Sequence, residues 1–448
     1  MPNILNLNAY QVLEVKENEH DYHIQAKTVL NPTHCPHCQS SDFVGFGRKE
    51  QLVRDLPIHG KRVGIYVDTK RFKCKSCERT FLERLPDVDE KRQMTSRLLA
   101  WMGKKSIKNT FVSIAEEIGV TENTVKAVFN DYINELERTV RFETPQWMGI
   151  DEIYLIKPRG VITNIQNRTV VEILHNRNKE TISKYLNGLH NKESIKYVAM
   201  DMWRPYKDAV EEILPNAMIV IDKFHVVKMA NEALEKVRKS VRLELDTKQR
   251  RYLKSDRLIL LKRRKELSEK EEFLISGWLN NYPQLALAYI AKEAFYEIYE
   301  AENLIEANRR YGEWLTMIKP EIAPAFSDLI KAFENWQPYI LNYFTHRITN
   351  AYTESLNSLI RVMDRLGRGY SFEALRAKIL FSEGVHKDKL KRPKFEKRSK
   401  QMGNTMCRMA LASDYANEDF YDSSEKQVIG NYGADISILI KKILNDEL

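Results

Sequence analysis

The stretch Trp147–Ile156 reads Trp-Met-Gly-Ile-Asp-Glu-Ile-Tyr-Leu-Ile, an apolar and β-branched run with one carboxylate, Asp151, at its centre. Such a run predicts a buried strand. A second run of this kind, Ile195–Asp201, ends on another carboxylate, and Glu354 lies in a segment that we expect to be helical. Burying carboxylates beside one another is costly unless cations neutralise them, so these three acids predict a site for divalent metal ions.

Strands and helices alternate around this stretch. The pattern predicts strands over residues 149–156, 160–165, 169–174, 195–201 and 217–222, and amphipathic helices over residues 179–189 and 203–214. Three strands, helix, strand, helix, strand, helix is the order of a ribonuclease-H-like α/β core. No strand pattern appears from about Val226 to Arg347, so we expect a long helical insertion before the segment that carries Glu354.

Local spacing narrows the choice of acids. Asp151 and Glu152 are adjacent on a strand and point to opposite faces, so only one of them can join the cluster. Asn350, Glu354 and Asn357 share one face of the expected helix, where the two amides can orient the carboxylate or contact a phosphate.

Four of the five cysteines form two Cys-x-x-Cys pairs with 35 residues between the pairs. Two such knuckles joined by strand-like segments predict a zinc ribbon with one structural zinc ion. A redox role is disfavoured, because it needs only one Cys-x-x-Cys pair and a βαβ context. The expected ligands are Cys35, Cys38, Cys74 and Cys77. His34 and His37 are alternative ligands, although four thiolates are sufficient. The remaining Cys407 is most simply a small buried apolar residue.

A helix-turn-helix pattern covers Thr110–Leu136. Apolar residues recur with helical spacing on both sides of Gly119, which we expect to end the first helix, and Thr121 can cap the second. A generic helical hairpin has the same spacing. If the segment reads DNA, the start of its second helix faces the major groove. The residues there are Glu122, Asn123 and Lys126.

The charge favours a polyanionic partner. The net charge is +9, and 13 Lys or Arg stand against 3 Asp or Glu within Lys236–Lys265. Lys387–Lys400 holds 8 against 2. For either run taken alone, a solvated helix face is the alternative to contacts with phosphates. For the first run we predict DNA contacts by Arg250, Arg251, Arg263 and Arg264.

Length and hydropathy bound the remaining classes. A chain of 448 residues predicts about three domains. With 30% charged and 43% hydrophobic residues the composition is that of a folded soluble protein. No apolar stretch approaches the roughly 18 residues that span a bilayer, and no leader follows Met1, so we expect a cytoplasmic protein without a membrane partner.

Five motifs follow one another behind the zinc ribbon. They are Gly149–Glu152, Met200–Tyr206, Asp222–Lys228, Thr349–Arg361 and Arg368–Tyr370. Together they resemble the DDE transposases of bacterial insertion sequences, specifically the ISL-three family, over nearly the whole chain. The resemblance implies binding to terminal inverted repeats, and DNA strand cleavage and strand transfer that depend on Mg²⁺ or Mn²⁺, with two ions per active site.

The resemblance also assigns residues. The family's catalytic and metal-binding acids fall on Asp151, Asp201 and Glu354. Asp222 and His225 resemble an Asp-x-x-His element of related transposases, where they either hold the turn after the strand or act on DNA or the metal shell. The implied partner is double-stranded DNA, as terminal repeats and as target, and we expect a homodimer or a higher multimer on that DNA.

These patterns predict a multidomain α/β protein. The expected ranges are a zinc ribbon at 1–90, a helix-turn-helix domain at 91–143, a core at 144–228 and 347–386, a helical insertion at 229–346 and a basic tail at 387–448. One alternative is a DNA-binding regulator or domesticated transposase without catalysis, against which the intact acids argue. Another is a metal nuclease that cuts without joining, which a strand-transfer assay would distinguish.

Overall fold

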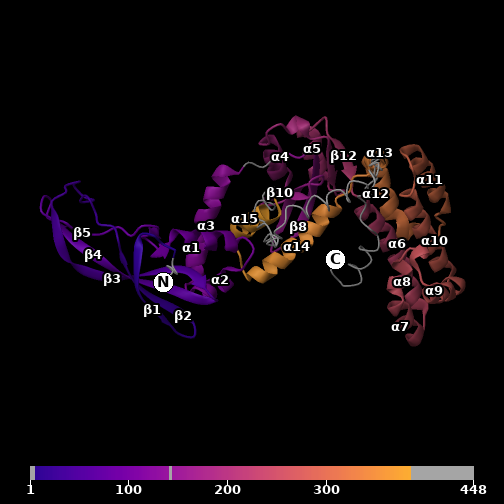
Figure 1. Cartoon of the computed structure of the whole chain (residues 1–448). Coiled ribbons are helices and arrows are strands. Elements are labelled where there is room, and N and C mark those ends of the chain that lie inside the picture. The colour runs from indigo at the N-terminus through magenta and orange to yellow at the C-terminus, as the bar shows by residue number, and fades with distance from the viewer. Residues whose placement is uncertain (1–5, 141–143, 385–448) are drawn as a thin grey trace, which may run out of the picture. The chain divides into compact units, whose positions relative to one another are not determined.

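The computed structural model describes residues 6–140 and 144–384 (Figure 1). They form two compact units, which we describe one at a time. Unit 1 holds the described residues before 141 together with residues 359–384, and unit 2 holds residues 144–358. The predicted tail, including Lys387–Lys400 and Cys407, lies outside the described residues.

A sheet in the order β1-β2-β4-β3-β7-β6, with β5 paired to β4, makes up much of unit 1. Its strands are β1 (Tyr10–Glu17), β2 (Asp21–Thr28), β3 (Phe43–Ile58), β4 (Lys61–Cys74), β5 (Thr80–Leu82), β6 (Val88–Asp89) and β7 (Met94–Thr95). Strand-like segments were expected between the two cysteine pairs, and residues 63–67 and 70–73 of that stretch both lie in β4. Strands β1 and β2 were not predicted, although Tyr22, Ile24 and Ala26 are buried at every second position of β2.

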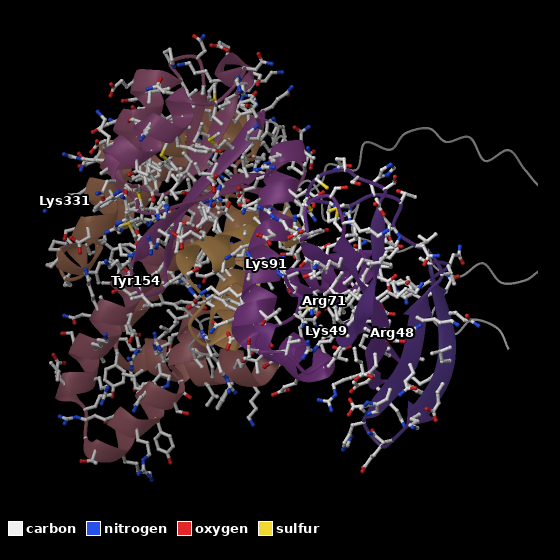
Figure 2. The ribbon with its side chains drawn as sticks, turned by 90° about the vertical axis from the view of Figure 1, so that its left-hand side faces the viewer. Arg48, Lys49, Arg71, Lys91, Tyr154 and Lys331 are labelled. Atoms are coloured by element: carbon white, nitrogen blue, oxygen red, sulfur yellow. The ribbon has the colours of Figure 1, made fainter. Side chains whose placement is uncertain are left out.

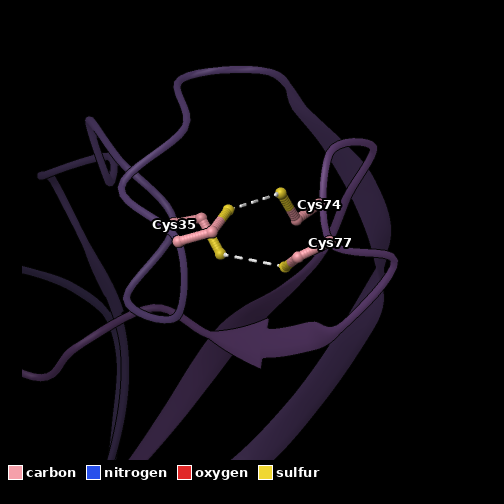
Figure 3. A group of neighbouring side chains, drawn as sticks. Cys35, Cys74 and Cys77 are labelled. Atoms are coloured by element: carbon pink, nitrogen blue, oxygen red, sulfur yellow. Dashed lines mark hydrogen bonds between the residues drawn. The ribbon is translucent and has the colours of Figure 1, made fainter.

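The long antiparallel hairpin of β3 and β4 carries both a basic surface and half of the cysteine site. Arg48, Lys49 and Arg71 lie on it and line a hollow of about 810 Å³ (Figure 2). At the end of the hairpin Phe43 pairs with Cys74. This pairing brings the second Cys-x-x-Cys pair beside the first (Figure 3).

The predicted helix-turn-helix is confirmed. It consists of α2 (Phe111–Ile118) and α3 (Glu122–Thr139), preceded by α1 (Ser96–Ser106), which packs against α3. Gly119 ends α2 with a φ of 73°, a left-handed conformation that glycine adopts at no steric cost. Thr121 caps α3, because its side chain accepts a hydrogen bond from the backbone N–H of Thr124.

Helix α15 (Phe372–Glu383) packs into these helices of unit 1, whereas we predicted the whole of residues 347–386 as part of the core. Lys378 of α15 is only 2% exposed. Its Nζ donates to the backbone carbonyl oxygens of Ser106 and Asn109, the latter at 2.8 Å, and lies 4.5 Å from the centre of the Phe111 ring. A segment late in the chain therefore completes the helical part of unit 1.

A five-stranded sheet forms the centre of unit 2, in the order β10-β9-β8-β11-β12. The strands are β8 (Trp147–Tyr154), β9 (Pro158–Asn164), β10 (Thr169–Leu174), β11 (Tyr197–Met200) and β12 (Met218–Ile221), with helices α4 (Lys179–Asn187) and α5 (Arg204–Ile213) between them. Strand β9 is antiparallel to both β8 and β10, and β8, β11 and β12 run parallel. All five predicted strands and both helices are confirmed, with ends that differ by a few residues.

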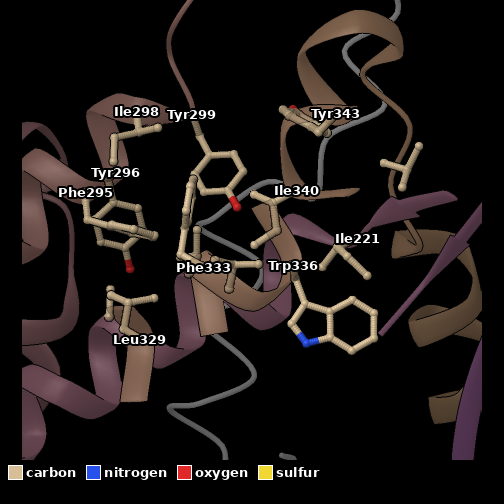
Figure 4. Close-up of a cluster of buried hydrophobic side chains, with 14 of the residues drawn as sticks. Ile221, Phe295, Tyr296, Ile298, Tyr299, Leu329, Phe333, Trp336, Ile340 and Tyr343 are labelled. Carbon is tan, nitrogen blue, oxygen red and sulfur yellow. The ribbon is translucent and has the colours of Figure 1, made fainter. Parts of the chain in front are cut away.

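The segment from Val226 to Arg347 contains no strand, as predicted. Its helices are α6 (Lys223–Glu244), α7 (Thr247–Ser255), α8 (Arg257–Leu261), α9 (Glu269–Asn281), α10 (Pro283–Ile298), α11 (Leu304–Met317), α12 (Ala323–Leu341) and α13 (Tyr343–His346). Phe295, Phe333, Trp336 and Ile340 are buried in one apolar cluster with Ile221 of β12 (Figure 4). The insertion therefore shares its core with the sheet. None of the described helices is long and apolar enough to cross a membrane.

Candidate active site and zinc site

Three aspartates follow the same register on neighbouring parallel strands. The residues directly before Asp151, Asp201 and Asp222 pair with one another across β8, β11 and β12. Neighbouring strands lie about 4.8 Å apart, and residues in register point to the same face. The three carboxylates therefore form a row that crosses the three parallel strands toward their C-terminal ends.

Helix α14 (Ala351–Gly367) brings Glu354 to this row through a close approach to β8. A Cβ at Gly149 of β8 would lie 2.5 Å from Asn350 Oδ1 and 2.4 Å from Thr163 Oγ1, so only glycine leaves room for the helix start. Asn350 is fully buried and donates through Nδ2 to the carbonyl oxygen of Ile150 at 3.1 Å. Glu354 lies four residues after Asn350, and Asp151 directly follows Ile150. The contact between Asn350 and Ile150 therefore fixes Glu354 relative to Asp151.

Asn357 orients Asp151. Its Nδ2 donates to Asp151 Oδ2 at 2.8 Å, and the backbone N–H of Glu152 donates to Asp151 Oδ1 at 2.7 Å. We expected the amides of Asn350 and Asn357 either to orient the Glu354 carboxylate or to contact a phosphate; in the structure both amide groups donate to residues of β8. The Glu152 carboxylate forms an ion pair with Arg177.

His225, in the first turn of α6, lies among the acids. Its Nδ1 is 2.9 Å from Asp201 Oδ1 and 3.8 Å from Asp222 Oδ2. The same nitrogen is 4.0 Å from Glu354 Oε1. Burial lowers the pKa of His225, but its contacts with Asp201 and Asp222 outweigh this effect and raise the pKa to about 11. The imidazole therefore carries a positive charge that partly offsets the carboxylates.

One imidazolium does not neutralise the cluster. Burial and the charges of Asp222, Asp151 and Asp201 raise the pKa of Glu354 to about 9, against the opposing effect of His225. Asp222 Oδ2 is buried and has no hydrogen bond to any described residue. Mg²⁺ and Mn²⁺ prefer oxygen ligands, so a cluster of carboxylates suits them. Such an ion would offset the repulsion between the carboxylates and would give the Asp222 oxygen a partner.

The group of potential metal ligands in this cluster differs from the predicted trio. Asp222, His225 and Glu354 offer ligand atoms that all lie within 4.8 Å of one another. Among the described residues this group does not extend to Asp151 or Asp201. Asp222 is buried, with only 1% of its surface exposed.

A pocket of about 300 Å³ opens beside Asp201 and His225. It is also lined by Trp203 and Tyr206, which sequence reasoning did not assign to the site. Tyr206 is 1% exposed, and burial together with the charges of Asp151 and Asp201 raises the pKa of its hydroxyl. Both aromatic residues lie in the motif Met200–Tyr206 together with Asp201, and this closeness in sequence was the available signal.

The four predicted zinc ligands converge in unit 1. Cys35 Sγ lies 3.8 Å from Cys77 Sγ, and Cys38 Sγ lies 3.5 Å from Cys74 Sγ (Figure 3). A tetrahedral zinc ion with Zn–S bonds of about 2.3 Å has sulfur atoms about 3.8 Å apart, so the site fits this ion. Backbone N–H donors of Cys77 and Ser76 lower the pKa of the Cys74 thiol to about 6. The backbone of Ser40 lowers the pKa of the Cys38 thiol, but burial and the neighbouring thiols outweigh this and raise it to about 12. Neither His34 nor His37 belongs to this ligand group of the described residues.

The predicted DNA-contacting residues of the helix-turn-helix are accessible. Glu122, Asn123 and Lys126 are all exposed at the start of α3.

The basic run of the insertion is more heavily paired than its sequence suggests. Arg263 is 5% exposed and pairs with Glu300, so its guanidinium does not face solvent. Arg250 is exposed but donates to the carbonyl oxygens of Leu245 and Leu243. Arg264 is exposed and pairs with Glu272 at 2.6 Å, and Arg251 is exposed. The free positive charge is therefore smaller than the residue count indicates.

Sequence comparisons place these features in a family. A family model described as a transposase, of the ISL3 DDE type, matches residues 148–379, more than half of the chain. A model for the zinc-finger of transposase IS204/IS1001/IS1096/IS1165 matches residues 31–77, and one for the helix-turn-helix domain of transposase family ISL3 matches residues 83–133.

Two curated proteins illustrate the similarity. The chain is 26% identical over 326 residues to the transposase for insertion sequence element IS1001 of Bordetella parapertussis, covering 71% of this chain and 80% of the relative. It is 23% identical over 322 residues to the transposase for insertion sequence element IS1557 of Mycobacterium tuberculosis (strain ATCC 25618 / H37Rv), covering 65% and 72%. With a zinc-ribbon and a helix-turn-helix domain before its transposase domain, the chain belongs to the ISL3 family of insertion-sequence transposases.

Proposed function

We propose that this transposase cuts and joins DNA strands at the acid cluster of unit 2, with divalent metal ions held by Asp151, Asp201 and Glu354. The observation that carries the proposal is the convergence of these acids from β8, the end of β11 and α14 in a chain of a transposase family. Asp222 and His225 support them as close neighbours of Asp201 and Glu354.

The core that holds the acids is proposed to be ribonuclease-H-like. Support comes from the sheet order, in which three antiparallel strands are followed along the chain by two strands parallel to the first. The long helical insertion comes after β12 and before the helix that bears Glu354, so it interrupts the core without separating the acids.

Two Mg²⁺ or Mn²⁺ ions bound there would supply activation of the attacking oxygen and stabilisation of the leaving oxygen in an in-line phosphoryl displacement. The protein's own part is to position the carboxylates. Asn357 holds Asp151, the contact of Asn350 with β8 holds the start of α14, and His225 keeps Asp201 in place through its ion pair.

Binding to terminal inverted repeats is proposed for unit 1. The exposed residues at the start of α3, Glu122, Asn123 and Lys126, are in the position from which a recognition helix contacts base edges. The zinc ion is proposed to be structural, because four protein ligands leave no open position for catalysis. Additional phosphate contacts are proposed for Arg250, Arg251 and Arg264 of the insertion, and the buried Arg263 is left out.

The test uses the purified full chain and labelled duplexes that carry an end of the element. We expect end-specific binding without divalent ions, and nicking followed by strand transfer to target DNA when Mg²⁺ is added. Binding without nicking in Mg²⁺ or Mn²⁺ would favour a regulator that lacks catalysis. Nicking without joining would favour a nuclease.

A further inference from the structure

The pocket beside Asp201 is a second binding feature of unit 2. Its volume is about 300 Å³, and it shares Asp201 and His225 with the acid cluster. Met202, Trp203 and Lys228 are among its other lining residues. A group that enters this pocket therefore lies next to whatever phosphate the acids act on.

Trp203 is the most unusual part of this pocket. Its side chain is 40% exposed, although most large aromatic residues of unit 2 are buried. The residue is nevertheless fixed in place. Its backbone N–H donates to the carbonyl oxygen of Asp201 at 2.8 Å, and the Arg177 guanidinium lies 4.6 Å from the ring centre.

Arg177 is itself held by its ion pair with Glu152, the neighbour of Asp151. Trp203 is thus linked to Asp201, the middle member of the acid row, through its backbone, and to the β8 end of the row through Arg177. An exposed aromatic that is held rigidly at a site presents a flat apolar face at low entropic cost, which is how proteins bind planar ligands.

Two methionines and one lysine of the pocket match one class of planar ligand, while Tyr206 and two further acids, Glu152 and Glu232, complete its lining. Met202 and Met229 are partly buried thioethers, which adapt to flat apolar surfaces, and Lys228 is a cation that can meet a phosphate. A nucleobase attached to its backbone phosphate has this combination of an apolar ring face and an adjacent negative charge.

We propose that this pocket receives one unstacked base of the DNA next to the scissile phosphate, and that Trp203 stacks on that base. The inference rests on the proposed function, because it takes the acid cluster as the cleavage site. In an intact duplex both faces of each base are covered by its neighbours, so a base reaches Trp203 only by leaving the stack. Stacking on an aromatic side chain repays this cost and does not depend strongly on base identity.

The experiment places 2-aminopurine singly at each position on either side of the cleaved phosphate. Full-length protein is bound to each duplex in Ca²⁺, without Mg²⁺, and the emission of the probe is measured. With the wild-type protein we expect a change in emission at one position. Trp203→Ala should lose this change, and Trp203→Phe should retain most of it because the smaller ring still stacks.

Phe273→Ala is the matched control. Phe273 of α9 is 79% exposed and does not line the pocket, so its removal should leave the emission as in the wild type. In Mg²⁺, Trp203→Ala should slow nicking by roughly 10- to 100-fold, which corresponds to the loss of one stacked base.

Two outcomes overturn the inference. One is a wild-type protein that nicks in Mg²⁺ yet changes the emission at none of the positions, which leaves the proposed function intact. The other is a Trp203→Ala protein that keeps the wild-type emission change. If the wild-type protein nicks no substrate, the proposed function itself fails, and the nicking assay shows this independently of the probe.

Discussion

The chain gathers anionic ligands in two places that differ in how well they match an ion. In unit 1, four identical sulfur atoms lie 3.5 and 3.8 Å apart in their closest pairs, close to the edge of a zinc tetrahedron. In unit 2, carboxylate oxygens of Asp201, Asp222 and Glu354 lie 2.9 to 4.0 Å from one imidazole nitrogen of His225. Burial and the charges of the neighbouring aspartates raise the pKa of Glu354 to about 9.

This difference agrees with the roles we propose, a structural site in unit 1 and a reactive site in unit 2. A set of four thiolates completes the coordination of zinc and leaves no position for substrate. The acid cluster supplies fewer protein ligands than hard divalent ions need, so positions remain for water and for a phosphate oxygen. We therefore expect the cysteine site to govern folding, and the acid site to govern chemistry with little effect on DNA binding.

The largest effect is expected from the acids. Asp151→Ala, Asp201→Ala and Glu354→Ala should each abolish Mg²⁺-dependent nicking while leaving end binding largely intact, because each removes a proposed metal ligand from unit 2 and none lies in the helix-turn-helix. Nicking and gel-shift assays on the same preparation measure both properties.

Asp364→Ala is the matched control for these variants. Asp364 lies on the same helix, α14, but has no part in the acid cluster, so this variant should nick as the wild type does. Near-normal nicking by one of the three acid variants would remove that residue from the site.

The cysteine site should respond differently. The double variant Cys74→Ser, Cys77→Ser should lose the zinc ion, of which we expect about one per chain, and with it the fold of the ribbon, because metal binding at such sites supplies folding free energy. Metal analysis by mass spectrometry measures the zinc content, and circular dichroism follows the fold. Cys407→Ser, outside both pairs, should keep its zinc. Equal zinc in the wild type and the double variant would contradict a four-thiolate site.

A smaller effect is expected where a side chain supports the acids. His225→Ala and Asp222→Ala should slow nicking by roughly 10- to 100-fold, as is typical when a residue that orients metal ligands is removed. Single-turnover rates in Mg²⁺ measure this loss. His225→Gln, which keeps a polar group near Asp201, should retain more activity than His225→Ala if positioning is the role.

Asp222 decides whether three acids are sufficient. It lies within 4.8 Å of Glu354 and His225, and one of its oxygen atoms has no hydrogen bond to the described residues. If Asp222→Ala is as inactive as Asp151→Ala, then Asp222 is itself a metal ligand and the three-acid account is incomplete.

The two sites also differ in how far sequence could predict them. The zinc ligands can be identified from the Cys-x-x-Cys spacing alone, because the two cysteines of one knuckle are close in any fold. The contact of Asn357 with Asp151 joins residues 206 positions apart, and that of Lys378 with Ser106 spans 272. Local periodicity predicts where a strand or helix lies but does not specify such distant partners.

Charge shows the same limit. Residue counts identified the basic run of the insertion, but the acidic partner of Arg263 lies 37 positions away, and that of Arg264 lies 8 away on a later helix. The sequence therefore predicted correctly that this region has a net positive charge, but the residue count overestimated how many of its cationic side chains lack an acidic partner.

The smallest expected effect concerns this remaining charge. The insertion lies in unit 2 and the four cysteines lie in unit 1, so we expect neutralising basic side chains of the insertion to change the salt dependence of DNA binding without changing the zinc content. Each contact removed should flatten the dependence of log affinity on log salt by about 0.9. Replacing Arg251 and Arg264 with Gln should thus reduce the slope by up to about 1.8, measured by fluorescence anisotropy across a salt series.

Arg263→Gln is the matched control for that series. Its guanidinium is buried and paired with Glu300, so the substitution should lower the stability of the insertion and leave the salt slope unchanged. An unchanged slope in the Arg251 and Arg264 variant would show that these side chains are solvated and touch no phosphate. A reduced slope in Arg263→Gln would show instead that DNA binding opens the Arg263–Glu300 pair.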